Sequence, residues 1–419
     1  MIKKLAKNIG KYKFDTIMSP LMISFEVVME VIIPLLMAKL IDDGITAGNM
    51  SAVLKFGAFL VIAALVSLSF GSLSCVFSAN ASAGFAANLR KKMFDNVQKF
   101  SFKNIDKFRT SSIITRLTTD VSNVQNAFQM LIRIAFRAPI MLITALVITI
   151  NISPTLSLTF LLIIPVLVVG FVFIIRAVFP VFSEVFKKYD KMNTVVQEDI
   201  AGIRVVKTYV REEYEKEKFR DASGEIYKYF SKGEKIMALM SPLMQFAMYT
   251  CTIIISYFGA VLIVKGIGGN TITTGELTSL ITYSGMILSS LMMVSMVIVM
   301  ITISRASAQR IVEILDEKSD ITNPEDPVYN VPDGSISFED VDFRYFETSE
   351  RKVLDDINLK IASGQTVGII GSTGSSKSSL IQLIARLYDT TAGVVKVGGT
   401  DVRKYDLESL RNAVAVVLQ

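Results

Sequence analysis

A glycine- and serine-rich stretch followed by a lysine carries the clearest chemistry in this sequence. Residues 364–379 read Gly-Gln-Thr-Val-Gly-Ile-Ile-Gly-Ser-Thr-Gly-Ser-Ser-Lys-Ser-Ser. The apolar run 367–370 predicts a buried strand, and Lys377 begins an apolar-periodic segment that predicts a helix as far as Leu387. A strand, a glycine-rich loop, a Lys-Ser pair and a helix, in this order, are typical of a phosphate-binding loop.

The residue types in this loop suit a bound triphosphate. Glycines let backbone N–H groups turn inward and form an anion-binding nest, and the N-terminus of the following helix adds partial positive charge. Lys377 supplies a point charge for the β- and γ-phosphates, and Ser378 supplies a hydroxyl ligand for Mg²⁺. We therefore predict a site for ATP and Mg²⁺ that is formed by Gly371, Ser372, Thr373, Gly374, Ser375, Ser376, Lys377, Ser378 and Ser379.

Ser376 departs from the general pattern, which has glycine directly before the lysine. If this position needs a positive φ, a residue other than glycine costs on the order of 1 kcal/mol or more. Because the rest of the loop follows the pattern so closely, we predict that Ser376 has an ordinary negative φ.

The composition indicates a membrane protein. Of the 419 residues, 51% are hydrophobic, and the mean hydropathy of +0.48 favours several membrane spans over an ordinary soluble fold. The net charge of +6 comes from basic residues that lie between apolar segments, which indicates membrane topology rather than binding to nucleic acid. The lack of histidine and the distant positions of Cys75 and Cys251, both in apolar runs, argue against a zinc site and a disulfide framework. We expect no secretory signal, because no small-residue cleavage site follows the first apolar run.

Six apolar segments are each near the roughly 20 residues that a helix needs to cross a bilayer. They lie at 16–41, 54–82, 128–150, 155–178, 239–264 and 275–302. The short gaps between them have almost no Lys or Arg, whereas the gaps 83–127 and 179–238 are long and basic. Positive charge on the inner side then puts both long gaps and both chain ends in the cytoplasm. The sequence therefore predicts a multi-pass α-helical membrane domain over 16–315, with six transmembrane helices and long cytoplasmic extensions.

Two features of this region leave alternatives open. Residues 1–15 are basic and mildly amphipathic, so they form either an interfacial helix on the cytoplasmic membrane surface or a frayed basic tail. Glu26 and Glu30 are four residues apart and share one face of the first span. Since acids at membrane depth are costly, they either line a substrate cavity, lie near an interface, or form salt bridges within the bundle.

A soluble domain follows the sixth span. Residues 316–334 are polar and contain Pro324, Pro327 and Pro332, which predicts a linker. Over 335–419 the pattern predicts an α/β domain with strands at 336–345, 353–361 and 394–397, together with the loop and helix described above.

Six spans with long cytoplasmic extensions, followed by a phosphate-binding loop, resemble an ATP-binding cassette (ABC) exporter half-transporter. The resemblance is carried by 371–379, Arg386-Leu-Tyr-Asp389, Gly398-Gly399-Thr-Asp-Val402, 407–411, and the cytoplasmic stretches 116–120 and 198–207. It implies a type IV exporter-like ABC fold in which 371–379 is the Walker A loop and 335–419 is the N-terminal part of the nucleotide-binding domain. It also implies coupling helices near 110–117 and 200–208, which rest on nucleotide-binding domains.

The resemblance assigns roles to two further residues. Tyr345 takes the place of the aromatic residue that stacks on adenine, although an ordinary strand tyrosine also fits this position. Gln419 matches the Q-loop glutamine, which helps to coordinate Mg²⁺. The family's signature motif, Walker B acids, D-loop and switch histidine all lie later than this glutamine. We therefore expect a fragment of a longer protein or a truncated product, with no complete set of catalytic residues.

The function implied by the resemblance is ATP-driven export of a small amphipathic or lipophilic substrate, of the multidrug type. The full-length dimer would be a transport ATPase in the bacterial cytoplasmic membrane. Ser376 and the strongly apolar character resemble subunits of heterodimeric multidrug exporters, so a second half-transporter subunit in a heterodimer is favoured over a homodimer. A lipid flippase, a peptide exporter of the same family, and a non-transporting membrane sensor regulated by nucleotide are the alternatives.

Overall fold

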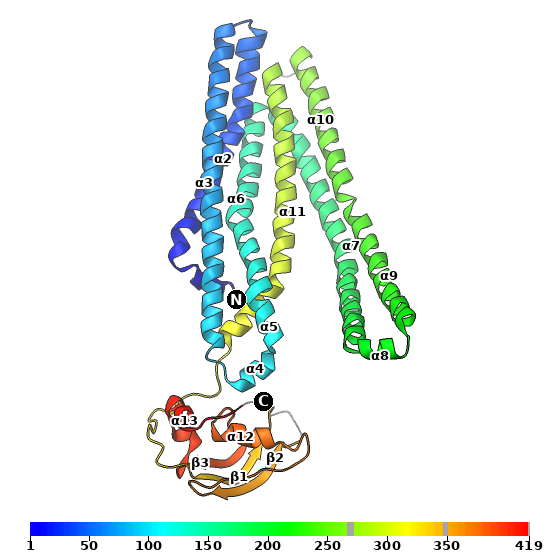
Figure 1. Ribbon diagram of the computed structural model, residues 1–419. Coiled ribbons are helices and arrows are strands. Elements are labelled where there is room, and N and C mark those ends of the chain that lie inside the picture. The colour runs from blue at the N-terminus through cyan, green and yellow to red at the C-terminus, as the bar shows by residue number, and fades with distance from the viewer. Residues whose placement is uncertain (266–271, 347–350, 418–419) are drawn as a thin grey trace. The chain divides into compact units, whose positions relative to one another are not determined.

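The computed structural model describes residues 1–265, 272–346 and 351–417, which fall into two compact units (Figure 1). The helical unit contains residues 11–82 and 126–302. The mixed unit contains residues 1–10, 83–125 and 303–419, and it includes the sheet. The long helices α3 (Met50–Val97), α6 (Val121–Ile152) and α11 (Thr274–Asp316) contribute residues to both units.

Six stretches of helix in the described residues are long and apolar enough to cross a membrane. They are Ile2–Thr46, Met50–Val97, Thr110–Ile152, Pro154–Ala201, Glu212–Val264 and Thr274–Asp316. Each contains one predicted span, so the six-helix membrane domain is confirmed. The first stretch includes α2 (Lys13–Lys39) and the π-helix η2 (Leu40–Thr46), and the fifth includes α9 (Glu212–Met237) and α10 (Met240–Lys265).

The helical unit is held together by an apolar core and by a few buried polar contacts between helices. Helix α7 (Pro154–Ala201) runs beside α9 and α10, and the short helix α8 (Ile203–Thr208) joins α7 to α9 (Figure 1). The core combines residues of α2, α6, α7, α10 and α11, among them Val31, Phe160, Ile255 and Leu280. Tyr283 of α11 is fully buried, and its hydroxyl donates to the carbonyl oxygen of Val31 at 2.6 Å, so its one polar atom is satisfied.

The N-terminal segment is not one continuous helix. It consists of α1 (Ile2–Ala6) and the 3₁₀ segment η1 (Lys7–Tyr12), which is kinked at Gly10 with φ 57°. A Cβ at Gly10 would lie 3.0 Å from Nδ2 of Asn88, so a close approach and a positive φ both favour glycine here. The amide of Asn88 donates to the carbonyl oxygen of Asn8 at 2.9 Å, so the alternative of a frayed tail is wrong. Its place on a membrane surface stays a prediction.

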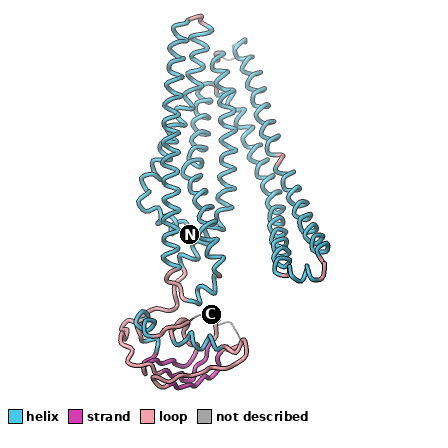
Figure 2. The backbone as a smooth tube through the Cα atoms, in the orientation of Figure 1, coloured by secondary structure: helices cyan, strands magenta, loops and turns pink. Residues whose placement is uncertain are grey.

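The mixed unit contains one antiparallel sheet in the order β2-β1-β3-β4. Its strands are β1 (Ile336–Phe343), β2 (Leu354–Ile361), β3 (Ala392–Val397) and β4 (Thr400–Asp401). Figure 2 shows these strands gathered with the helices α12 (Lys377–Ile384) and α13 (Leu407–Ala413) in the C-terminal part of the chain. The three strands predicted at 336–345, 353–361 and 394–397 are thus confirmed.

The strand predicted at 367–370 is wrong. These residues have no regular secondary structure and pair with none of the four strands, and Ile370 is 99% exposed. An apolar run forms a buried strand only when a neighbouring strand bonds to its N–H and C=O groups, and the described residues offer none at this place. The helix that follows does form, and it begins at Lys377 as predicted.

Candidate functional site

The ammonium of Lys377 lies inside the loop that precedes it. Its Nζ donates to the carbonyl oxygens of Gly371 and Ser372, each at 2.9 Å, and to Oγ of Ser375 at 3.2 Å. The loop therefore curls around a fixed positive charge at the N-terminus of α12. All three acceptors are neutral oxygens, which phosphate oxygens can replace with stronger, charge-assisted hydrogen bonds.

Two glycines, Gly371 and Gly374, allow the loop to fold tightly. A Cβ on Gly371 would lie 2.5 Å from Oγ of Ser375, so a side chain there would force Ser375 to move. Gly374 has φ 86°, a left-handed conformation that favours glycine. Such angles turn successive N–H groups toward one another, as an anion-binding nest requires. The shape and the cation together fit a polyphosphate.

Ser376 has φ 62° and ψ 21°, so the predicted negative φ is wrong. The chain turns through a left-handed residue to pass from the loop into α12, and the Ser376 carbonyl already accepts the first helical bond, from Leu380 N at 3.2 Å. A non-glycine residue in this conformation costs roughly 1–2 kcal/mol. The position therefore needs the backbone freedom for which the general pattern has glycine.

The two serines after Lys377 have different surroundings. Ser378 is exposed, so its hydroxyl is open to a metal ion beside the loop. Ser379 is buried, and its Oγ lies 2.7 Å from the hydroxyl of Tyr345. These surroundings fit Ser378 as the ligand of Mg²⁺ and Ser379 as an anchor between α12 and the end of β1.

Tyr345 lies beside the first turn of α12. Its ring makes edge-to-face contacts with Phe343 at 4.9 Å and with Tyr388 at 5.2 Å between centroids. The ring is partly exposed, as stacking on a base requires. Its role at adenine stays a prediction, supported by its position near the loop. Gln419, predicted as a ligand of Mg²⁺, lies outside the described residues.

Glu26 and Glu30 share one arginine in the helical unit. Nη1 of Arg137 on α6 contacts Oε1 of Glu26 at 2.5 Å, and Nη2 contacts Oε2 of Glu30 at 2.6 Å. The sequence left a substrate cavity, an interface position and a salt bridge within the bundle open for these two acids, and the structure shows the salt bridge. Because Arg137 already supplies the compensating positive charge, these acids give no reason to expect a preference for cationic substrates. Sequence reasoning missed this partner, although the two arginines in the apolar run 128–150, Arg133 and Arg137, are a usable signal.

The coupling helices expected near 110–117 and 200–208 stay a prediction, and the structure shows which elements these residues form. In the first long gap, 83–127, a contact with the sheet domain comes from α4 (Phe102–Phe108), which precedes the predicted 110–117. A capping box between Ser101 and Asn104 begins α4, because each side chain accepts from the other residue's backbone N–H. Residues 110–117 instead form α5 (Thr110–Thr115) and the start of a π-helix. Near 200–208 the structure has the predicted short helix, α8, whose partner stays a prediction.

Comparison with known proteins finds two family matches on this chain. The model of the ABC transporter transmembrane region matches residues 16–308, and the model of the ABC transporter matches residues 354–419.

Proteins with similar sequences are known from several bacteria. An uncharacterised ABC transporter ATP-binding protein of Bacillus subtilis, YfiB, is 30% identical over 394 residues, which are 94% of this chain and 68% of the relative. One from Mycobacterium tuberculosis is 28% identical over 389 residues, 92% of this chain and 66% of the relative. A fatty acid ABC transporter ATP-binding/permease protein of Mycobacterium bovis is 26% identical over 307 residues, 73% of this chain and 48% of the relative. The chain thus spans about two thirds of the length of the first two relatives.

Proposed function

Because the chain belongs to the ABC transporter family, as an exporter-type half-transporter with a membrane domain and part of an ATPase domain, we propose that it works in ATP-driven export across the bacterial cytoplasmic membrane. The observation that carries this proposal is the loop folded around Lys377, in a chain whose described residues also include six helical stretches long enough to cross a membrane. In this proposal both chain ends lie in the cytoplasm, where ATP is available.

The residues of the loop have separate tasks in this proposal. Lys377 holds the β- and γ-phosphates, the backbone N–H groups of 371–376 surround them, and Ser378 holds Mg²⁺. Tyr345 orients the adenine. The bound Mg²⁺ offsets charge on the phosphates during phosphoryl transfer. Since each site in this family lies between two nucleotide-binding domains, activity requires the full-length protein and a second half-transporter. The strained Ser376 supports a heterodimer in which this loop belongs to the less regular site.

The proposed substrates are small amphipathic or lipophilic molecules of the multidrug type. Two features support this class: the strongly apolar membrane helices, and the relative named as a fatty acid transporter. Lipid flipping and peptide export are the alternatives within transport.

The test uses the full-length protein with its second half in proteoliposomes. We expect ATP hydrolysis that lipophilic amphiphiles stimulate, together with their movement into the compartment opposite the ATP sites. Lys377→Ala should lower both. Nucleotide binding that alters assembly while no substrate moves would overturn export and support a nucleotide-regulated sensor.

A further inference from the structure

The charge of helix α9 changes sign along its length. Its first part, 212–225, has six acidic residues and three basic ones, whereas its last part, 226–237, has Lys228, Lys232 and Lys235 with a single acid, Glu234. This last part leads into the apolar helix α10 (Figure 1). Helix α9 is therefore basic at the end where the chain reaches the candidate membrane span, and acidic at the end that is furthest from it.

The three lysines share one face of α9, which we call the lysine face. A helix turns by about 100° per residue, so they lie within an arc of about 60°. The buried residues Ala222, Ile226 and Gly233 form a different face. A Cβ on Gly233 would lie 2.8 Å from the ring of Phe182, so this second face packs closely on α7. The lysine face points away from that contact, and all three of its lysines are exposed.

The lysine face has no acidic partner in the part of the chain that the structure describes. None of its three lysines forms an ion pair or a side-chain hydrogen bond there. Glu225, one turn before Lys228, bonds instead to Lys188 of α7 at 2.8 Å. Glu234, at the same end of α9, bonds to none of the three within the described residues. The fold thus leaves three neighbouring positive charges for something outside these residues.

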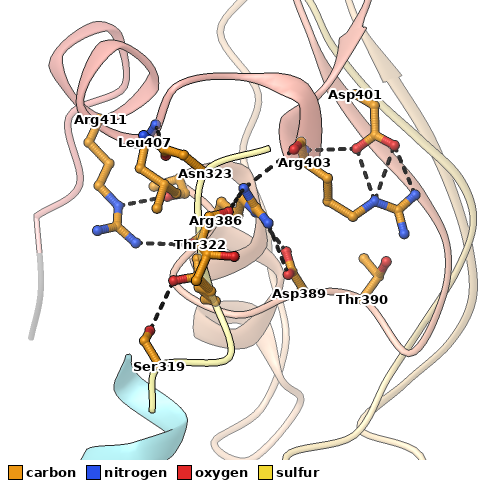
Figure 3. Close-up of polar contacts among 12 residues, drawn as sticks. Ser319, Thr322, Asn323, Arg386, Asp389, Thr390, Asp401, Arg403, Leu407 and Arg411 are labelled. Atoms are coloured by element: carbon orange, nitrogen blue, oxygen red, sulfur yellow. Dashed lines mark hydrogen bonds and ion pairs between the residues drawn. The ribbon is translucent and has the colours of Figure 1, made fainter. Parts of the chain in front are cut away.

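Basic side chains that the fold itself uses are arranged differently. In the mixed unit, Arg386 is buried and bonds to Asp389 at 2.9 Å, and Arg403 bonds to Asp401 at 2.8 Å (Figure 3). Each of these pairs holds its arginine in place and neutralises its charge. The lysine face shows neither effect, which favours a role in binding an anion over a role in holding α9 in place.

A hollow of about 420 Å³ lies along the lysine face. It is lined by the three lysines together with Tyr227, Ser231 and Ile236. Every polar group in this lining is an ammonium or a hydroxyl, so each can donate a hydrogen bond, and no carboxylate is among them. Phosphate oxygens accept strong, charge-assisted hydrogen bonds from such groups. The lining therefore fits a phosphate group.

The lysines also lie at the right depth for lipid headgroups. At about 1.5 Å of rise per residue, Lys235, Lys232 and Lys228 lie roughly 6, 10 and 16 Å from the start of the apolar segment 239–264. The headgroup layer covers roughly the first 5–8 Å outside the hydrocarbon. The attraction of an anionic surface extends about one Debye length further, about 8 Å at physiological salt. All three lysines therefore lie within the reach of an anionic membrane surface.

We propose that the lysine face of α9 binds the phosphate headgroup of an anionic lipid in the surrounding bilayer. The ammonium groups bond to the phosphate, and the bound lipid anchors the start of α10 at the membrane surface. In the proposed orientation this lipid belongs to the cytoplasmic leaflet. The site goes beyond the proposed export, because the transporter binds this lipid and does not move it.

The test uses the full-length transporter with its second half in vesicles of phosphatidylcholine that contain increasing amounts of phosphatidylglycerol. The chain has no tryptophan, so Tyr227→Trp adds a reporter to the hollow. Energy transfer from this tryptophan to headgroup-labelled phosphatidylglycerol measures binding, and the same protein without the tryptophan gives the background. Each lysine near an anionic surface contributes about fivefold in affinity. The triple variant Lys228→Gln, Lys232→Gln, Lys235→Gln should therefore need at least about tenfold more phosphatidylglycerol for half-maximal transfer.

The matched control is the triple variant Lys216→Gln, Lys218→Gln, Arg220→Gln. It removes the same charge from the acidic part of α9, where Lys216 bonds to Glu213 at 2.7 Å and Lys218 bonds to Glu198 at 3.1 Å. This variant should keep lipid binding within about twofold of the unmodified protein, because its charges lie further from the membrane than a Debye length. Equal losses in the two triple variants would overturn the site and indicate a general charge effect.

Two further outcomes would assign the lysine face to another occupant. Release of the labelled lipid by inorganic phosphate would overturn the lipid and indicate a soluble anion. Protection of the three lysines from acetylation in the lipid-free transporter would show that the second half-transporter covers this face, and would overturn the proposal as well. No ATP is added in these measurements, so their result does not depend on export, and a failure of export would overturn the proposed function alone.

Discussion

The hydroxyl of Tyr345 lies 2.7 Å from Oγ of Ser379, two residues after Lys377 in the first turn of α12. This contact holds the end of β1 against the phosphate-binding helix. Stacking on adenine uses the face of the ring and leaves the hydroxyl free for this bond. The two roles can therefore be separated by mutation.

We expect Tyr345→Phe in the full-length protein to keep ATP affinity within about threefold, because the ring remains. Tyr345→Ala should weaken binding by roughly 1–3 kcal/mol, the range measured for base–aromatic stacking. Titration with ATP measures both, and Tyr329→Ala, which changes an exposed tyrosine in the preceding segment, is the control. Equal losses of ATP affinity in Tyr345→Phe and Tyr345→Ala would show that the hydroxyl, and not the ring, supports binding.

Lys377→Ala should abolish most ATP binding, since it removes the only cation that the structure places inside the loop at 371–376. A charge-assisted contact contributes about 1.5–3 kcal/mol, so the affinity should fall by one to two orders of magnitude. Nucleotide titration checks this. Lys396→Ala is the matched control, because this lysine is in the same domain and pairs with Glu339 at 2.7 Å. Similar losses in both variants would indicate a general charge effect.

Ser376→Gly should stabilise the nucleotide-binding domain by about 1 kcal/mol, less the entropy that glycine loses on folding. We expect the loop to keep this left-handed turn with and without nucleotide, so the relief should apply to the free and bound states alike. We therefore expect ATP affinity to change by less than about tenfold, roughly 1.4 kcal/mol. Thermal unfolding and ATP titration measure the two effects, with Ser376→Ala as a control that keeps the strain. A much larger gain in affinity would mean that nucleotide binding changes this backbone.

These residues also show which features a sequence predicts and which it does not. The helix at Lys377, the strands β1, β2 and β3, and the six spans follow from periodicities that are local to each segment. The conformation of Ser376 depends on where the loop must meet the helix. Whether 367–370 forms a strand depends on a pairing partner, and none of the four described strands pairs with these residues. Arg137 lies more than 100 residues from Glu26 and Glu30. Their pairing is a tertiary contact that no local pattern contains.

Membrane topology can be tested by labelling single cysteines with an impermeant thiol reagent, after Cys75 and Cys251 are replaced by alanine. We expect labelling from outside the cell at Ala47 and Asn151, which are exposed in the short gaps, and none at Ser111 or Lys191 in the long gaps. Ser153 is a poor reporter, because it is buried as the N-cap of α7. The opposite labelling pattern would invert the proposed orientation.

The shared arginine gives a prediction about stability. Arg137→Met leaves Glu26 and Glu30 side by side without a counter-ion, which should cost roughly 3–5 kcal/mol, the range for breaking a buried ion pair. Adding Glu26→Gln and Glu30→Gln should recover most of this loss, because no buried charge then remains. Thermal unfolding followed by far-UV circular dichroism measures the effect, and Arg176→Met, at an exposed arginine of α7, is the control.

The shared arginine also gives a prediction about substrates. With Arg137 intact, replacing both acids by glutamine should affect the transport of cationic and neutral substrates equally. A selective loss of cationic transport would restore these acids as part of the substrate path.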